Sequence, residues 1–184
     1  MRQGRIIIIS GSPGTGKSTI ASIVAKESDF LKSVHMHTDD FYHYILKGAI
    51  PPFLPESEEQ NLIVIEAFLE AAKRFARGGF DVIVDGVVGP WFLEPCIKAV
   101  QDSYEVHYLI LRASKEETLK RAINRSKLSE DSNFELVEKM WEQFTNLGHY
   151  ESNIIDTTAQ SIEQSISTIR AVIEKKSSLL KSTD

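Results

Sequence analysis

The stretch GSPGTGKS at residues 11–18 decides the fold of this chain. An apolar run at residues 5–10, RIIIIS, precedes it and is typical of a buried strand, and residues 19–26, TIASIVAK, favour a helix. Glycines in the stretch permit backbone angles that a Cβ would forbid, so successive N–H groups can point inward. Because the positive end of the following helix lies on the same side, the sequence predicts a phosphate-binding loop.

The strand, loop and helix match the P-loop pattern G-x-x-x-x-G-K-[ST], in which each residue type has a chemical role. Lys17 supplies a cation for the β- and γ-phosphates of a nucleoside triphosphate, and Ser18 supplies a hydroxyl ligand for Mg²⁺. The alternative is a glycine-rich turn that binds nothing, and the flanking strand and helix argue against it. The loop residues that we expect to contact the nucleotide are Gly11, Ser12, Pro13, Gly14, Thr15, Gly16, Lys17, Ser18 and Thr19.

The composition is that of one ordinary globular domain over residues 1–184, with 42% hydrophobic and 26% charged residues. A net charge of −5 argues against binding to nucleic acids or anionic membranes, because both depend on a basic face. The single cysteine, Cys96, cannot form an internal disulfide, which fits a reducing compartment. With no signal peptide and no apolar run of membrane-spanning length, we expect a cytoplasmic monomer or homodimer.

Strand and helix patterns alternate along the rest of the chain. Short apolar strands are expected at residues 34–38, 82–84, 106–111 and 153–155. Among the helices between them, one is predicted to begin with a capping box of Ser57 and Gln60, and another covers residues 134–144. Residues 175–184 are expected to form a frayed tail. The alternation predicts an α/β fold, in which helices cover both faces of a mostly parallel sheet.

Carboxylates follow two of these strands: Asp39 and Asp40 come after the second strand, and Asp85 after the third. The carboxyl ends of parallel strands meet at one edge of the sheet, where ligands bind, so these side chains are expected beside the P-loop. We expect Asp85 to contact Mg²⁺ directly or through water. A role in a turn or a helix cap is the alternative for Asp85.

Arg121 and Arg125 lie on one face of a predicted helix, followed by a polar segment with no core-forming pattern. We therefore predict a lid around residues 121–134 that delivers guanidinium groups to a transferring phosphoryl group. The alternative is a solvated helix face that pairs with Glu117. A proline-rich loop at residues 47–55 is either a flap over a pocket or a plain surface connection.

Taken together, the P-loop, the acidic strand ends and the arginine-bearing lid resemble those of small P-loop kinases over the whole chain. The similarity is greatest to the group of zeta-toxin kinases and chloramphenicol phosphotransferase, with gluconate and shikimate kinases as more distant relatives. The resemblance implies a three-layer α/β/α fold of the nucleoside-monophosphate-kinase type. It also implies a five-stranded parallel sheet in the order 2-3-1-4-5, with ATP and Mg²⁺ as cofactors.

By the same resemblance, Asp39 accepts the proton of a substrate hydroxyl, with Asp40 as the alternative. Arg121 and Arg125 would bind the phosphates, and Arg121 would also contact ATP. Together with Lys17, these residues make up the expected catalytic set. Relatives such as shikimate kinase carry a second acidic residue two positions before the base, near the metal, where this chain has a histidine, His37.

The expected activity is transfer of the γ-phosphoryl group of Mg-ATP to a hydroxyl of a small molecule. Two alternatives stay open: a regulatory nucleotide-binding protein without kinase activity, and a polynucleotide end kinase, which the acidic balance disfavours. Arg112 either approaches phosphate or substrate or pairs with a carboxylate beneath the lid. Aromatic residues that suit an apolar acceptor pocket, or the core, are Phe41, Tyr42, Tyr44, Phe53, Trp91 and Phe92.

Overall fold

The computed structural model describes residues 3–125 and 130–181, and for residues 124–125 and 130–133 it describes the backbone alone. The strands are β1 (Arg5–Ser10), β2 (Ser33–His37), β3 (Asp81–Asp85), β4 (Glu105–Arg112) and β5 (Ile154–Asp156). The α-helices are α1 (Lys17–Lys26), α2 (Thr38–His43), α3 (Glu58–Arg77), α4 (Glu94–Gln101), α5 (Lys115–Arg125), α6 (Glu130–Glu142) and α7 (Ile162–Glu174). Short 3₁₀ helices are η1 (Pro55–Ser57), η2 (Pro90–Phe92) and η3 (Gly148–Asn153). Each helix in the described ranges is too short or too polar to cross a bilayer.

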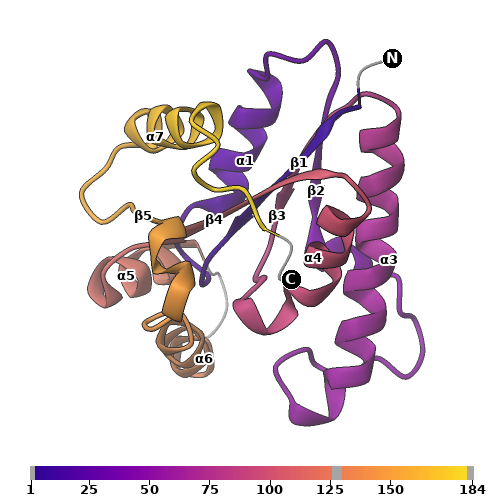
Figure 1. The fold of residues 1–184 in the computed structure, drawn as a ribbon. Helices are drawn as coiled ribbons and strands as arrows, with labels where there is room; N and C mark the ends of the chain where they lie inside the picture. Colours follow the sequence, from indigo (N-terminus) through magenta and orange to yellow (C-terminus); the bar gives the residue numbers. More distant parts are fainter. Residues whose placement is uncertain (1–2, 126–129, 182–184) are drawn as a thin grey trace.

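The strands form one parallel sheet in the order β2-β3-β1-β4-β5 (Figure 1). At its centre, Ile8 of β1 lies opposite Val84 of β3 and Tyr108 of β4. Helices α1 and α7 cover one face, and α3 and α4 cover the other. The predicted α/β fold and strand order are confirmed, so the carboxyl ends of β1, β2 and β3 lie side by side at the P-loop.

The side chains of β1 supply both halves of the core. Ile6 and Ile8 pack with residues of α3 and α4, whereas Ile7 and Ile9 pack with residues of α1 and α7. Successive side chains of a strand point to opposite faces, so a sheet covered on both sides needs an apolar residue at every position. Each of these isoleucines is at most 2% exposed, and each burial stabilises the fold by about 1.5–3 kcal/mol. This burial holds β1 in the centre and so fixes where the P-loop begins.

The capping box predicted at the start of α3 is wrong. The hydroxyl of Ser57 lies 2.9 Å from the backbone oxygen of Pro52 and 2.7 Å from that of Leu54, and it makes no capping bond. The amide of Gln60 instead binds the backbone N–H and C=O of Ile50. The proline-rich loop folds back onto the helix. Its backbone groups form hydrogen bonds with Ser57 and Gln60, the two side chains of the expected capping box. Both side chains therefore anchor the loop.

The segment after α5 also differs in part from the prediction. The helix expected at residues 134–144 is α6, which begins earlier and ends earlier, at residues 130 and 142. Residues 130–134 of the expected lid thus belong to a regular helix. Residues 126–129 of that lid lie outside the described residues.

Part of the C-terminal segment expected to fray, residues 175–184, is instead held against the sheet, through residue 180. Residues 182–184 of that segment lie outside the described residues. Strand β5 pairs only with the last part of β4, which leaves the edge of β4 around His107 without a neighbouring strand. Figure 1 shows the yellow chain after α7 returning along this edge, where Leu179 forms an antiparallel bridge with His107. Ser178 Oγ lies 2.9 Å from His107 Nδ1, and Leu180 is buried at 7% exposure. The open backbone groups of β4 explain why a polar tail is ordered here.

Replacing Leu180 with alanine should lower the free energy of unfolding by about 2–4 kcal/mol, because the side chain is buried in the core. Urea denaturation measures the change. The matched control is Lys181→Ala at the next, exposed position, for which a change below about 0.5 kcal/mol is expected. Equal stabilities of the two variants would show that the tail does not stabilise the fold.

Candidate active site

The P-loop turns from β1 into α1 through glycines that no other residue could replace without strain. Gly11 has a φ of 142° and Gly14 a φ of 84°. A Cβ would lie 2.2 Å from the backbone oxygen of Leu111 at the first position, and 2.6 Å from that of Thr118 at the second. These neighbours are backbone atoms, so no side-chain rotation relieves the clash. The loop therefore keeps an open concavity at the positive end of α1, as a phosphate cradle requires.

Lys17, the first residue of α1, lies over this loop. It is 8% exposed, and its Nζ donates a hydrogen bond to the backbone oxygen of Ser12 at 2.8 Å. The hydroxyl of Thr15 donates to the same oxygen at 2.9 Å. The ammonium group of Lys17 therefore places a positive charge at the loop, on the side where the phosphates of a ligand would lie.

Asp85, at the end of β3, is fully buried and joins the P-loop to β2. Ser18 Oγ donates to its Oδ2 at 2.5 Å. His35 Nε2 lies 2.5 Å from Oδ1, and His37 Nδ1 lies 3.0 Å from Oδ2. Burial alone would raise the pKa of Asp85, but the hydrogen bonds from His35, His37 and Ser18 outweigh it and hold the pKa well below its usual range. Asp85 is therefore an ionised carboxylate fixed against the first turn of α1.

His37 connects this carboxylate to Asp39, whose Oδ2 lies 3.3 Å from His37 Nε2. Hydrogen bonds to Asp39 and Asp85 raise the pKa of His37 to about 10, so the ring is a cation at neutral pH. The hydrogen bond from His37, assisted by the charge of Lys17, lowers the pKa of Asp39. Asp39 is thus a carboxylate, oriented on one side by an imidazolium and open to a ligand on the other.

No role for His35 followed from the sequence, although a signal was present. His35 and His37 are two positions apart on β2, so they share one face of the strand. The pairing of β2 with β3 places His37 directly beside Asp85. A pair of histidines at this spacing, next to a strand that ends in aspartate, is the pattern that could have indicated the cluster.

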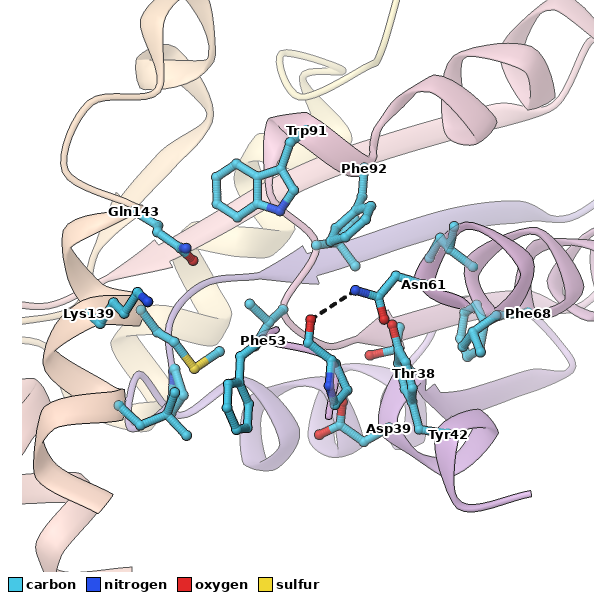
Figure 2. Close-up of a pocket in the computed structure, with 18 residues that line it drawn as sticks. Thr38, Asp39, Tyr42, Phe53, Asn61, Phe68, Trp91, Phe92, Lys139 and Gln143 are labelled. Carbon is cyan, nitrogen blue, oxygen red and sulfur yellow. Dashed lines mark hydrogen bonds between the residues drawn. The ribbon is translucent and has the colours of Figure 1, made fainter. Parts of the chain in front are cut away.

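Beside Asp39 a cavity of about 420 Å³ opens between α2, α3 and α6 (Figure 2). Pro13 of the P-loop and Asp39 both line it, so the cavity borders the phosphate cradle. Most of its wall is apolar or aromatic, which suits a small organic ligand. The lining residues are Pro13, Thr38, Asp39, Tyr42, Pro52, Phe53, Asn61, Val64, Ile65, Phe68, Val87, Val88, Trp91, Phe92, Leu136, Lys139, Met140 and Gln143.

The aromatic residues expected in an acceptor pocket divide into two groups. Those that line the cavity are Tyr42, Phe53, Trp91 and Phe92. Phe41 instead packs edge-on against Phe68, with 5.0 Å between ring centroids, and Tyr44 is 71% exposed. The proline-rich loop contributes Pro52 and Phe53 to the wall, as the flap alternative requires.

Arg121, the first arginine of the expected lid, is held by groups of the protein in this structure. Arg121 Nε donates to Glu117 Oε1 at 2.7 Å, and its Nη2 donates to the backbone oxygen of Thr157 at 3.1 Å. The pairing with Glu117 agrees with the alternative given for this helix, a face whose arginine pairs with Glu117. The side chain of Arg125 lies outside the part of the chain that the structure describes.

Arg112 and Asp40 lie outside the cavity lining given above. Arg112 makes two hydrogen bonds to the carboxylate of Glu151, at 3.1 and 3.0 Å, and so joins the end of β4 to η3. This is the structural pairing that the sequence left open. Asp40 is exposed on α2, one position beyond the carboxylate that borders the cavity.

The residues around the cradle fit ATP and Mg²⁺, the cofactors expected from the sequence. In the described ranges, no group of three or more His, Cys, Asp or Glu side chains is placed to hold a metal ion alone. Mg²⁺ is commonly held by one or two carboxylates together with the phosphates of a bound nucleotide. Ser18 and Asp85, in contact beside the cradle, have the oxygen atoms that such a site would use.

Several known proteins of similar sequence or structure are kinases. The chain is 27% identical to a guanylate kinase of Clostridium acetobutylicum, over 94% of this chain and 86% of that protein. The APS kinase CysC of Mycobacterium tuberculosis, solved in complex with AMPPNP and APS, has a TM-score of 0.69 at 15% identity, over 95% of this chain and 99% of that chain. A gluconokinase from Sinorhizobium meliloti has a TM-score of 0.65 at 16% identity, over 96% of this chain and 98% of that chain. The fold is therefore that of the P-loop kinases.

One protein family matches most of the described site. The family AAA_18, described as an AAA domain, matches residues 7–139. This span contains the P-loop, Asp39 and Asp85, together with most of the cavity wall. The chain belongs to the AAA_18 family.

Proposed function

We propose that this protein is an ATP-dependent phosphotransferase that acts on a hydroxyl group of a small molecule bound in the cavity. The observation that carries the proposal is the position of Asp39. Its carboxylate borders the cavity and is close enough to Lys17 for the lysine charge to lower its pKa. A carboxylate between a phosphate cradle and an acceptor pocket is the one group that phosphoryl transfer to an alcohol requires besides positioning and charge neutralisation.

On the nucleotide side, we propose that residues 11–19 bind the phosphates through backbone N–H groups and Lys17, and that Ser18 and Asp85 hold Mg²⁺. When bound, Mg-ATP supplies the phosphoryl group and the dication that offsets its charge. Arg121 and Arg125 are proposed to reach the phosphates as well. In support, α5 packs against the P-loop: a Cβ at Gly14 would meet Thr118 and Ala122, on either side of Arg121.

On the acceptor side, we propose that Asp39 orients the hydroxyl and accepts its proton as the new P–O bond forms. His37 keeps Asp39 ionised and fixes one of its oxygens, so the other oxygen is available to the acceptor. The apolar wall would bind the organic part of the acceptor beside this carboxylate.

The charges around the cavity favour an alcohol acceptor over a phosphate acceptor. Lys139 is the one basic side chain in the lining given above, and the carboxylate of Asp39 faces the same space. A phosphate acceptor would need several cations to offset its charge beside Asp39. The resemblance to the zeta-toxin and chloramphenicol phosphotransferase group also supports a hydroxyl.

The similarity to guanylate kinases favours a second candidate acceptor, the phosphate of a nucleoside monophosphate. Comparing GMP with a panel of neutral alcohols, each with Mg-ATP, separates the two. A regulatory protein without kinase activity would phosphorylate neither.

Replacing Gly14 with alanine should weaken Mg-ATP binding at least about tenfold, because the new Cβ collides with the backbone of α5 and distorts the cradle. The matched control is Gly48→Ala. Gly48 also has a positive φ, 77°, but nothing lies within 4 Å of a Cβ there. Both variants place an alanine at a positive φ, so they carry a similar backbone cost. A difference between them in Mg-ATP affinity, measured by calorimetric titration, therefore reports the clash at Gly14. Undiminished ATP binding by the Gly14 variant would contradict the proposed cradle.

Replacing Asp39 with asparagine should lower the rate of phosphoryl transfer to an alcohol by about 10²–10⁴-fold, because the amide cannot accept the proton. Mg-ATP binding should change by less than about threefold. Asp40→Asn is the control at the neighbouring exposed position and should retain activity. Transfer is followed as labelled phosphate incorporated into the alcohol. If the Asp40 variant loses activity and the Asp39 variant keeps it, the assignment of the base is wrong.

A further inference from the structure

One polar side chain in the cavity wall has an atom without a hydrogen-bond partner among the described residues. Asn61, on α3, is 4% exposed and lines the cavity. Its Nδ2 donates to the backbone oxygen of Pro52 and to Ser57 Oγ, both at 2.8 Å. Its Oδ1 is buried and accepts no hydrogen bond from any residue that the structure describes. A buried acceptor without a donor is costly, and such costs are usually offset when a ligand binds.

The neighbours of Asn61 determine which end of its amide is unpaired. The buried hydroxyl of Ser57 has its proton directed to the backbone oxygens of Pro52 and Leu54, so towards Asn61 it acts as an acceptor. Pro52 likewise offers only a carbonyl oxygen. Turning the amide over would place Oδ1 against two acceptors. The network therefore holds Nδ2 on the loop and leaves Oδ1, an atom of a side chain that lines the cavity, without a donor among the described residues.

The wall around this acceptor is fixed before any ligand arrives. The amide of Gln60 binds both backbone groups of Ile50, and Asn61 binds Pro52, so two neighbouring residues of α3 tie down the same loop. Figure 2 shows Asn61 in the cavity wall, with a dashed line marking its bond to this loop. A rigid acceptor of this kind discriminates between ligands that can donate a hydrogen bond and those that cannot.

The rest of the lining limits what the ligand can be. Aromatic side chains from separate loops and helices surround the space, and Figure 2 places Phe53, Phe68, Trp91 and Phe92 around it. The charged side chains in the lining are Asp39, whose role is with the reacting hydroxyl, and Lys139 of α6. Such a wall favours an uncharged ring over a phosphate or a carboxylate.

We propose that Asn61 is a specificity-determining residue whose Oδ1 accepts a hydrogen bond from an N–H or O–H of the substrate. The substrate is accordingly a neutral, ring-containing alcohol that carries this donor in addition to the hydroxyl that is phosphorylated. The inference rests on the proposed function, because that function places the reacting hydroxyl at Asp39.

The test uses matched pairs of probes that differ in this donor. The benzoyl amide of ethanolamine has a ring, an N–H and an alcohol, and the benzoyl ester of ethylene glycol lacks only the N–H. A second pair carries a naphthoyl ring in place of the benzoyl ring. Dissociation constants are measured by calorimetry on the full chain with Mg²⁺ and a non-hydrolysable ATP analogue, so that no turnover is needed.

The wild-type protein should bind an amide at least about tenfold more tightly than its ester, since only the amide satisfies the buried acceptor. In Asn61→Leu this preference should fall to within about twofold. In Gln60→Leu, which removes the neighbouring tie to the same loop but keeps Asn61 in place, the preference for the amide should remain.

Three results would overturn the inference: no amide preference in the wild type, an unchanged preference in Asn61→Leu, or no binding of any probe. An equal loss for amide and ester in Asn61→Leu would show that Asn61 only holds the loop. Transfer from Mg-ATP to the probes is assayed separately. Amide-selective binding without transfer would contradict the proposed function and leave the specificity assignment standing.

Discussion

The buried carboxylate of Asp85 constrains the arrangement of the whole site. A negative charge with no solvent contact must be surrounded by hydrogen-bond donors, because removing one partner of a buried ion pair commonly costs about 3–5 kcal/mol. Ser18, His35 and His37 are these donors, and they come from α1 and β2. Satisfying one carboxylate therefore aligns three parts of the fold: the end of β3, the first turn after the P-loop, and the strand that leads to Asp39.

Charges of opposite sign alternate outward from this point. Asp85 is negative, His37 is held positive, and Asp39 is negative and lies within the influence of Lys17. Each ionised group stabilises the charged form of the next one, so the series is stronger than its separate pairs. The result is a row of charges between the P-loop and the apolar cavity that is in place before any ligand binds.

The fold and the shape of the P-loop could be predicted from the sequence because they depend on local patterns. The run of isoleucines in β1 and the glycine spacing of the P-loop each identify a strand or loop without reference to distant residues. The cluster of His35, His37 and Asp85 could not be predicted in the same way, since it forms only once β2 and β3 are paired in register. The unpaired Oδ1 of Asn61 could not be predicted either, because it depends on how a proline-rich loop folds back over α3. For the same reason a capping box was expected at Ser57, whose hydroxyl binds that loop instead.

The short length of β5 has a consequence beyond packing. An uncovered strand edge offers its N–H and C=O groups to any extended peptide, and sheets that expose one tend to join with other sheets. Here the backbone of residues 178–180 occupies the edge of β4 that β5 leaves open. Being tethered to the same molecule, this segment outcompetes foreign strands through its high effective concentration. Residues 178–180 thus close the part of the β4 edge that would otherwise be open to a foreign strand.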